Sequence, residues 1–199
     1  MNAPETKPLV FEPGGASGEL ARRLRGAVAG DVLFDRASRG RYATDASIYQ
    51  VEPIGVLVPR SDADVRAAFD ICRGLSVPLL PRGAGSSQCG QSVGAALVVD
   101  HGKHLNRVVA FDRDARSVTV EPGIVLDALN AWLKPHGLWF PVDISTASRA
   151  TLGGMVGNNS CGARSLRYGN TKENVLSVDA VLPNGARAHF GPVAHGAHV

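Results

Sequence analysis

Apolar side chains recur at helical spacing near the start of the chain and in short continuous runs further along. Leu20, Leu24 and Val28 fall on one face, which predicts an amphipathic helix. The unbroken apolar run at residues 54–58 predicts a buried strand. A second helix is expected directly after that strand, because Ser61 is a favourable N-cap and acidic residues follow it.

The segment from residue 54 to residue 80 has a β-α-β pattern. The second helix ends at Gly74, and residues 77–80 form the next apolar run. A β-α-β unit of this kind would place two parallel strands side by side. Another buried strand is predicted at residues 97–100.

The pattern changes in the second half of the chain. Short strands at residues 108–111 and 117–121 are separated by a polar turn, as in a hairpin. A helix is predicted over residues 125–136, and a further strand over residues 175–182. The two patterns predict an α+β chain of two lobes, a small β-α-β lobe followed by a larger, mainly antiparallel one.

Composition and charge narrow the possible functions. The net charge of +3 is small and dispersed, without a basic block interleaved with aromatics, so nucleic-acid binding is disfavoured. The longest apolar runs, about six residues, are far shorter than a membrane span. The N-terminus has no basic-then-apolar order, so no secretory signal is expected and a cytoplasmic location is predicted. Residues 1–15 are expected to be a flexible leader, followed by an N-terminal helical segment at 16–48.

The three cysteines are widely spaced. Cys72, Cys89 and Cys161 form no C-x-x-C pair, so they cannot by themselves hold an iron–sulfur cluster or tetrahedral zinc. Their odd number fits a reducing compartment. We expect neither a metal site nor iron–sulfur ligands within this chain.

A loop of glycines and small hydroxyl residues lies between two predicted strands, at residues 81–94. Glycine lets the backbone approach a ligand closely, and successive amides can converge on an anion, so a phosphate cradle is one interpretation. An ordinary surface loop is the other. Gln91 stands where a nucleotide-triphosphate P-loop has its lysine, which argues against triphosphate hydrolysis. The dinucleotide fingerprint also fails, because Gly85 is followed by glycine only at Gly90 and the loop leads into a strand.

A second region of small residues lies at 141–162, where hydroxyl groups and glycines alternate. The pair Gly153 and Gly154 could simply allow a helix to pack closely. Because each lobe carries one such region, the two could instead clamp a long phosphate-bearing ligand between the lobes.

These regions resemble two motifs of the FAD-linked oxidases of the vanillyl-alcohol oxidase and p-cresol methylhydroxylase type. The first motif is the pyrophosphate loop, matched by residues 81–87, 90–91 and 105–107. The second is a flavin-binding segment, matched by residues 151–162, 167–171 and 174–176. The chain is most similar to the branch of glycolate oxidase D-subunits and D-lactate dehydrogenases, which includes 2-hydroxyacid dehydrogenases fused to iron–sulfur domains.

The resemblance implies a two-lobed FAD-binding domain of the p-cresol methylhydroxylase type over residues 49–199. The first lobe would span 49–104 and the second 105–199, with the second incomplete at its C-terminus, as in an N-terminal fragment. The residues expected to contact FAD are Arg82, Gly83, Ala84, Gly85, Ser86, Ser87, Gly90, Gln91, Pro141, Asp143, Ser145, Ser148, Thr151, Gly153, Gly154 and Asn158. Some relatives attach flavin to a histidine in the pyrophosphate loop, where this chain has Ser86 and Ser87, so the FAD is expected to be non-covalent.

The resemblance also implies oxidation of a small 2-hydroxy acid, such as D-lactate, glycolate or 2-hydroxyglutarate, to the 2-oxo acid. Alternatives are a truncated, non-catalytic FAD-binding module and an electron-transfer flavoprotein. Acid–base groups of the family lie largely in a later cap domain, so a cap or iron–sulfur domain would come from further sequence or a partner subunit. Peripheral attachment to the inner face of a membrane is an alternative to a purely cytoplasmic location.

No histidine of the chain is a convincing catalytic base. We expect His101 and His104 to be solvated in a polar turn, and His136 ends a predicted helix, where a histidine is favourable in any case. His195 and His198 belong to a small-residue tail that is expected to fray. The catalytic residues are therefore left unassigned.

Overall fold

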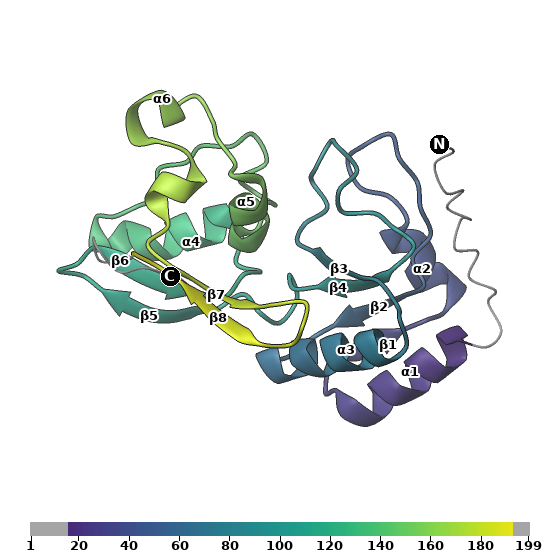
Figure 1. Cartoon of the computed structure of the whole chain (residues 1–199). Helices are drawn as coiled ribbons and strands as arrows, with labels where there is room; N and C mark the ends of the chain where they lie inside the picture. The colour runs from purple at the N-terminus through teal and green to yellow at the C-terminus, as the bar shows by residue number, and fades with distance from the viewer. Residues whose placement is uncertain (1–15, 193–199) are drawn as a thin grey trace, which may run out of the picture.

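The computed structural model describes residues 16–192, so the predicted leader and both tail histidines lie outside the described part. The chain forms two lobes that lie side by side (Figure 1). The predicted α+β architecture is confirmed, with a mostly parallel sheet in the first lobe and two antiparallel hairpins in the second.

The first lobe is built on a four-stranded sheet of order β1-β2-β4-β3. Strands β2 (Gly55–Val58) and β3 (Leu79–Arg82) both run parallel to β4 (Leu97–Asp100), which lies between them. Strand β1 (Asp31–Leu33) pairs antiparallel with β2 at the edge. Residues from the expected N-terminal helical segment therefore extend the sheet of the first lobe.

The expectation that the strands of the β-α-β unit lie side by side is wrong, because β4 is inserted between β2 and β3. The physical reason for this strand order is the burial of apolar side chains. The first three residues of β4 and all of β2 are buried, whereas β3 is only partly so. A strand that is apolar on both faces buries most surface at the centre of a sheet covered on both sides.

Helices cover both faces of this sheet. Helix α1 (Ala16–Ala27) packs on α3 (Asp62–Gly74), and this pair covers the face that carries Leu57 of β2. Helix α2 (Arg36–Tyr42) packs on the opposite face, where Tyr42 contacts the cluster containing Val56. The predicted cap of α3 is confirmed, since the Ser61 side chain accepts a hydrogen bond from the Asp64 amide at 3.3 Å.

The second lobe begins with the predicted hairpin and continues through short helices. Its elements are β5 (Val108–Asp112), β6 (Ser117–Val120), α4 (Leu126–Leu133), the 3₁₀ turn η1 (Lys134–His136), α5 (Leu152–Asn158), α6 (Ser165–Tyr168), the 3₁₀ turn η2 (Thr171–Asn174), β7 (Val178–Val181) and β8 (Arg187–Phe190). The core joins Leu126 and Leu129 of α4 to Leu152 and Met155 of α5. Gly137 ends the α4–η1 segment with a φ of 70°, as expected.

The two lobes are also attached through the β7–β8 hairpin, which reaches α3 of the first lobe (Figure 1). At the turn, Arg73 donates to the carbonyl of Asn184, and Arg187 pairs with Asp62. All four groups are at the surface. The contact holds the lobes together away from the two regions of small residues.

Candidate functional site

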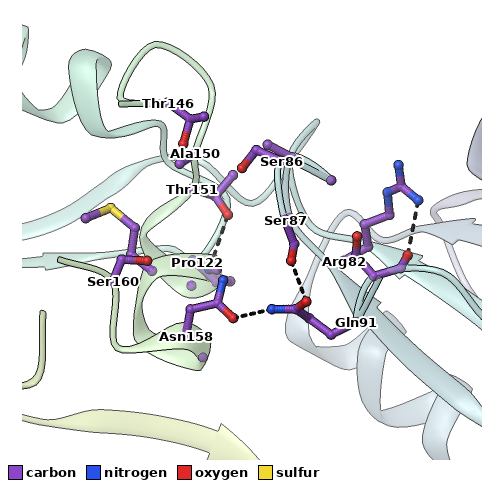
Figure 2. Close-up of a pocket in the computed structure, with 18 of the residues that line it drawn as sticks. Arg82, Ser86, Ser87, Gln91, Pro122, Thr146, Ala150, Thr151, Asn158 and Ser160 are labelled. Carbon is purple, nitrogen blue, oxygen red and sulfur yellow. Dashed lines mark hydrogen bonds between the residues drawn. The ribbon is translucent and has the colours of Figure 1, made fainter. Parts of the chain in front are cut away.

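The two regions of small residues face one another across a cavity of about 520 Å³ between the lobes (Figure 2). One wall is the loop that follows β3, and the other is the segment that contains α5. The residues expected to contact FAD that line the cavity are Arg82, Gly83, Ala84, Gly85, Ser86, Ser87, Gln91, Thr151, Gly153, Gly154 and Asn158. None of the residues that line it is acidic.

Five other residues expected to contact FAD lie outside the cavity lining: Gly90, Pro141, Asp143, Ser145 and Ser148. Gly90 has a φ of 75° and packs against the ring of Tyr49. The carboxylate of Asp143 accepts a hydrogen bond from the Arg164 amide at 2.8 Å, which fixes the turn before α6.

The wall of the first lobe is a glycine loop. Gly85 has a φ of 65°, a left-handed conformation that glycine adopts without strain. Gly83 touches the other lobe, because a Cβ at this position would collide with the hydroxyl of Thr151. The amides of residues 84–87 donate to no other group in the described part of the chain. This wall can therefore present several backbone donors to an anion.

In the wall of the second lobe, the backbone amides at the start of α5 are already engaged. At the start of α5, the amide of Leu152 donates to Ile124 at 2.9 Å and that of Gly153 donates to Pro122 at 2.8 Å. The Thr151 hydroxyl caps the helix by accepting from the Gly154 amide at 3.3 Å. The start of α5 therefore contributes side chains and shape rather than free backbone donors.

A side-chain bridge crosses the cavity (Figure 2). The amide nitrogen of Gln91, in the loop of the first lobe, donates to the amide oxygen of Asn158 at the end of α5, at 2.8 Å. Ser87 in turn donates to the side-chain oxygen of Gln91. The three side chains connect the two walls directly.

Arg82 is directed away from the cavity centre. Its guanidinium donates to the carbonyl oxygens of Thr44, Ser92 and Tyr42, at 2.7, 3.1 and 3.2 Å. Its direction could not be read from the sequence, because two of the three acceptors lie about forty residues earlier in the chain.

His101 is a lining residue that sequence reasoning placed wrongly. It was expected to be solvated, but it lines the cavity, and burial lowers its pKa below the usual 6.5. Its position could have signalled this, because it directly follows the carboxyl end of the central parallel strand β4. His104, also expected to be solvated, is half-buried, with its Nε2 atom 3.7 Å from Asp31 Oδ2.

Other lining residues were not singled out from the sequence. They are Pro81, Ser92, Pro122, Ile144, Thr146, Ala150, Met155, Gly157, Ser160 and Cys161. Most belong to the two regions of small residues, but Pro122 enters from the turn after β6. It was missed because its place in the cavity depends on the contact with α5, which is remote in sequence.

Over residues 16–192 no group of three or more His, Cys, Asp or Glu side chains is placed to hold a metal ion. Cys89 and Cys161 are free and exposed, and Cys72 is free and buried. Over the same residues, no helix has both the length and the apolar character needed to cross a membrane.

A family described as FAD binding domain matches residues 53–191. D-2-hydroxyglutarate dehydrogenase of Pantoea ananatis is 43% identical over 172 residues, covering 82% of this chain and 16% of that protein. The glycolate oxidase subunit GlcD of Bacillus subtilis is 36% identical over 166 residues, covering 79% of this chain and 34% of that protein. The chain therefore spans between a sixth and about a third of the length of these relatives.

Solved structures share the fold at lower identity. An alkyldihydroxyacetonephosphate synthase superposes with a TM-score of 0.79 at 22% identity, covering 92% of this chain and 36% of that one. A p-cresol methylhydroxylase with substrate bound superposes with a TM-score of 0.73 at 16% identity, covering 92% of this chain and 40% of that one. The two-lobed arrangement is thus the fold of a wider group of proteins.

Proposed function

Because the chain belongs to the FAD binding domain family, we propose that it is the FAD-holding part of a flavin-dependent oxidoreductase that converts a 2-hydroxy acid to the 2-oxo acid. FAD is the cofactor of this family of domains, and relatives named D-2-hydroxyglutarate dehydrogenase and GlcD suggest the substrate class. The activity belongs to the whole protein, since this chain spans between a sixth and about a third of the length of these relatives.

The observation that carries the proposal is the set of unbonded amides at residues 84–87. A diphosphate needs several donors and no nearby carboxylate, and this wall meets both conditions. Gly85 permits the backbone to turn there, so the donors can converge. The loop would hold the diphosphate of FAD with backbone groups.

The opposite wall suits the remainder of the cofactor. Ile144, Ala150 and Met155 contribute apolar surface, and Thr146 and Ser160 contribute hydroxyl groups. An aromatic ring system with a polar edge fits such a mixed surface. The cavity volume of about 520 Å³ falls within the range of small-molecule sites, roughly 300–1,000 Å³.

When bound, FAD supplies the capacity to accept a hydride equivalent from the α-carbon of the substrate. The residues of this chain would hold and orient FAD, exclude water on the side of α5 and stabilise the negative charge of the FAD diphosphate. The substrate carboxylate needs a cation and the hydroxyl needs a base. We assign these two groups to a cap domain or partner subunit outside this chain.

We further propose that FAD is held without a covalent bond. Ser86 and Ser87 occupy the loop position at which some relatives carry an attaching histidine, and a serine hydroxyl is a poor nucleophile at neutral pH. Precipitating the FAD-loaded protein with acid should leave all flavin in the supernatant. Flavin in the pellet would contradict the proposal, and replacement of His101 or Cys161, the imidazole and the thiol that line the cavity, would then test where the bond forms.

The location we propose is cytoplasmic, with peripheral membrane attachment as the alternative. Sedimentation with membranes from cells that express the whole protein distinguishes the two. Recovery of the protein in the supernatant at physiological salt supports a cytoplasmic location. Recovery in the membrane pellet, with release by high salt, supports peripheral membrane attachment.

The function is tested by loading the protein with FAD and following the flavin absorbance. We expect a yellow protein whose band bleaches, in the longer protein, on addition of D-lactate, glycolate or 2-hydroxyglutarate under exclusion of oxygen. A protein that stays colourless after FAD addition would overturn the cofactor assignment. Colour without bleaching by any of the three acids would instead support a binding or electron-transfer module.

A further inference from the structure

We propose that Arg82 is a positioning residue, whose guanidinium fixes the shape of the phosphate-facing loop from behind without contacting the phosphates. This inference rests on the proposed FAD site, because the loop in question is its diphosphate wall. It departs from the interpretation in which Arg82 supplies positive charge directly to the cofactor.

The hydrogen bonds of Arg82 bring three separate parts of the chain together. Its Nη1 donates to the carbonyls of Tyr42, the last residue of α2, and of Ser92, near the far end of the loop. Its Nη2 donates to the carbonyl of Thr44 at 2.7 Å. Arg82 itself ends β3, where the loop begins. One side chain thus joins the beginning of the loop, its end and the segment that packs behind it.

The guanidinium is itself held in place. Its Cζ atom lies 5.3 Å from the centre of the Tyr42 ring, and the Tyr42 hydroxyl donates to Asp100 Oδ2 at 2.6 Å. Asp100 is the partner of Arg82 in the register of β3 and β4. Burial, together with the Asp100 carboxylate, raises the pKa of Tyr42 above its usual value, so this hydroxyl remains a donor. The sheet and α2 therefore determine where the guanidinium can lie.

The loop backbone rests directly on this guanidinium. A Cβ at Gly85 would come within 2.9 Å of Arg82 Cζ and 3.0 Å of its Nε. The carbonyl of Gly85 accepts a hydrogen bond from the Ala46 amide at 3.0 Å, and the Ser92 hydroxyl donates to Asp45 at 2.7 Å. The carbonyls of Gly85 and Ser92 are thus occupied from behind, while the amides of residues 84–87, which line the cavity, stay unbonded.

Lysine and arginine differ in a way that separates positioning from direct charge contact. Arginine spreads its donors over a rigid planar fork, whereas lysine has one compact ammonium group. The three carbonyls of Tyr42, Thr44 and Ser92 are reached by two different nitrogens of the fork. Arg82→Lys therefore keeps the charge but loses the geometry, and Arg82→Gln loses both.

The first test measures the dissociation constant of FAD by flavin fluorescence titration for the wild type, Arg82→Lys and Arg82→Gln. We expect both variants to bind at least about tenfold more weakly, and by similar factors, since a tenfold change corresponds to about 1.4 kcal/mol. Near-wild-type affinity in Arg82→Lys with a large loss in Arg82→Gln would show direct charge contact and overturn the inference. Arg113→Lys, at an exposed position in the β5–β6 turn, is the matched control and should bind as the wild type does.

The second test needs no cofactor, so it distinguishes a failure of this inference from a failure of the proposed function. Hydrogen exchange of the Ala46 amide, which is bonded to Gly85, reports the loop contact in the FAD-free protein. We expect faster exchange at Ala46 in Arg82→Lys, with unchanged exchange in the buried strand β4, which shows that the sheet is intact. Unchanged exchange at Ala46 would overturn the inference, whether or not the wild type binds FAD.

Discussion

The two walls of the cavity contain glycines that serve different purposes. In the loop of the first lobe, Gly85 has a positive φ, and the amides around it are unbonded in the described part of the chain. At the start of α5, Gly153 is helical, and its amide donates to Pro122. A Cβ at Gly153 would lie 2.9 Å from the Pro122 carbonyl oxygen, so glycine there permits close packing.

This difference shows that a run of small residues can serve either a binding loop or a closely packed helix. The first run makes a donor-bearing surface that needs support from behind, which Arg82 supplies through three carbonyls. The second run makes a helix that is supported by its own Thr151 cap and by the turn after β6. We therefore expect substitutions in the first wall to act on FAD binding, and those in the second to act first on stability.

The largest effect is expected from Gly85→Val. A branched side chain at a φ of 65° is strained, and it would also collide with the Arg82 guanidinium. FAD affinity should fall at least about a hundredfold, equivalent to about 2.7 kcal/mol, in a fluorescence titration. Gly26→Ala is the control, since a Cβ at Gly26 in α1 meets open space away from the cavity, and this variant should leave the affinity unchanged. Wild-type affinity in Gly85→Val would refute the diphosphate wall.

The next effect is a loss of stability in Gly153→Ala. The added methyl would press on the ring and carbonyl of Pro122, at 2.7 and 2.9 Å, in a closely packed helix contact. The free energy of unfolding should fall by about 1–3 kcal/mol in urea titrations. Gly157→Ala, on the open side of the same helix, should instead raise it by up to about 1 kcal/mol. Equal effects at the two positions would contradict the distinct role of Gly153.

A smaller effect is expected at the bridge between the walls. The hydrogen bond from Gln91 to Asn158 is neutral and exposed, so its net contribution to stability should be about 0.5–1 kcal/mol. The single variants Gln91→Ala and Asn158→Ala and their double variant form a cycle in which the effects on unfolding are not additive. Full additivity would mean that the two side chains do not interact in solution.

The smallest effect concerns pH. Burial lowers the pKa of His101 in the folded protein, whereas in the unfolded chain it is near the ordinary 6.5. As the pH falls through about 6.5, the unfolded chain takes up the proton first, so stability is lost progressively until the folded pKa is passed. The urea concentration at the midpoint of unfolding is measured at pH values of about 7 and 5.5. The difference between the two midpoints should be smaller in His101→Asn than in the wild type. An identical shift in both proteins would show that His101 is not buried as described.

Local sequence patterns predicted the main helices of the first lobe but not the order of the strands in its sheet. The helical spacing of Leu20 and Leu24 and the cap Ser61 predicted α1 and α3 correctly, because these signals act within one or two turns. The position of β4 between β2 and β3 was not predicted, because strand order depends on burial that only the whole sheet defines. A closely packed helix at Gly153 and Gly154 was one of two interpretations, and α5 confirms it; the sequence alone did not decide because this glycine-rich helix is stabilised by contacts with Pro122 and Ile124.

The cavity residues were predictable where a local motif resembled that of a known family, and unpredictable where a side chain depends on partners that are distant in sequence. Residues 83–87 were singled out as a loop of glycines and small hydroxyl residues that resembles a pyrophosphate loop, and they line the cavity. The direction of Arg82 was not readable, because its acceptors include Tyr42 and Thr44 of another element. The polar neighbours of His101 in sequence predict a solvated turn, whereas the carboxyl end of β4 places His101 in the cavity.

The three cysteines give the wild-type chain a built-in way to measure the separation of its lobes. Cys89 lies in the loop of the first lobe and Cys161 lines the cavity after α5, and both thiols are free and exposed. Cys72 would not compete for labels, because it is buried and burial raises the pKa of its thiol to about 11. A pair of spin labels or fluorophores can therefore be attached without any substitution. The distance between them would report how far apart the lobes lie in the FAD-free protein.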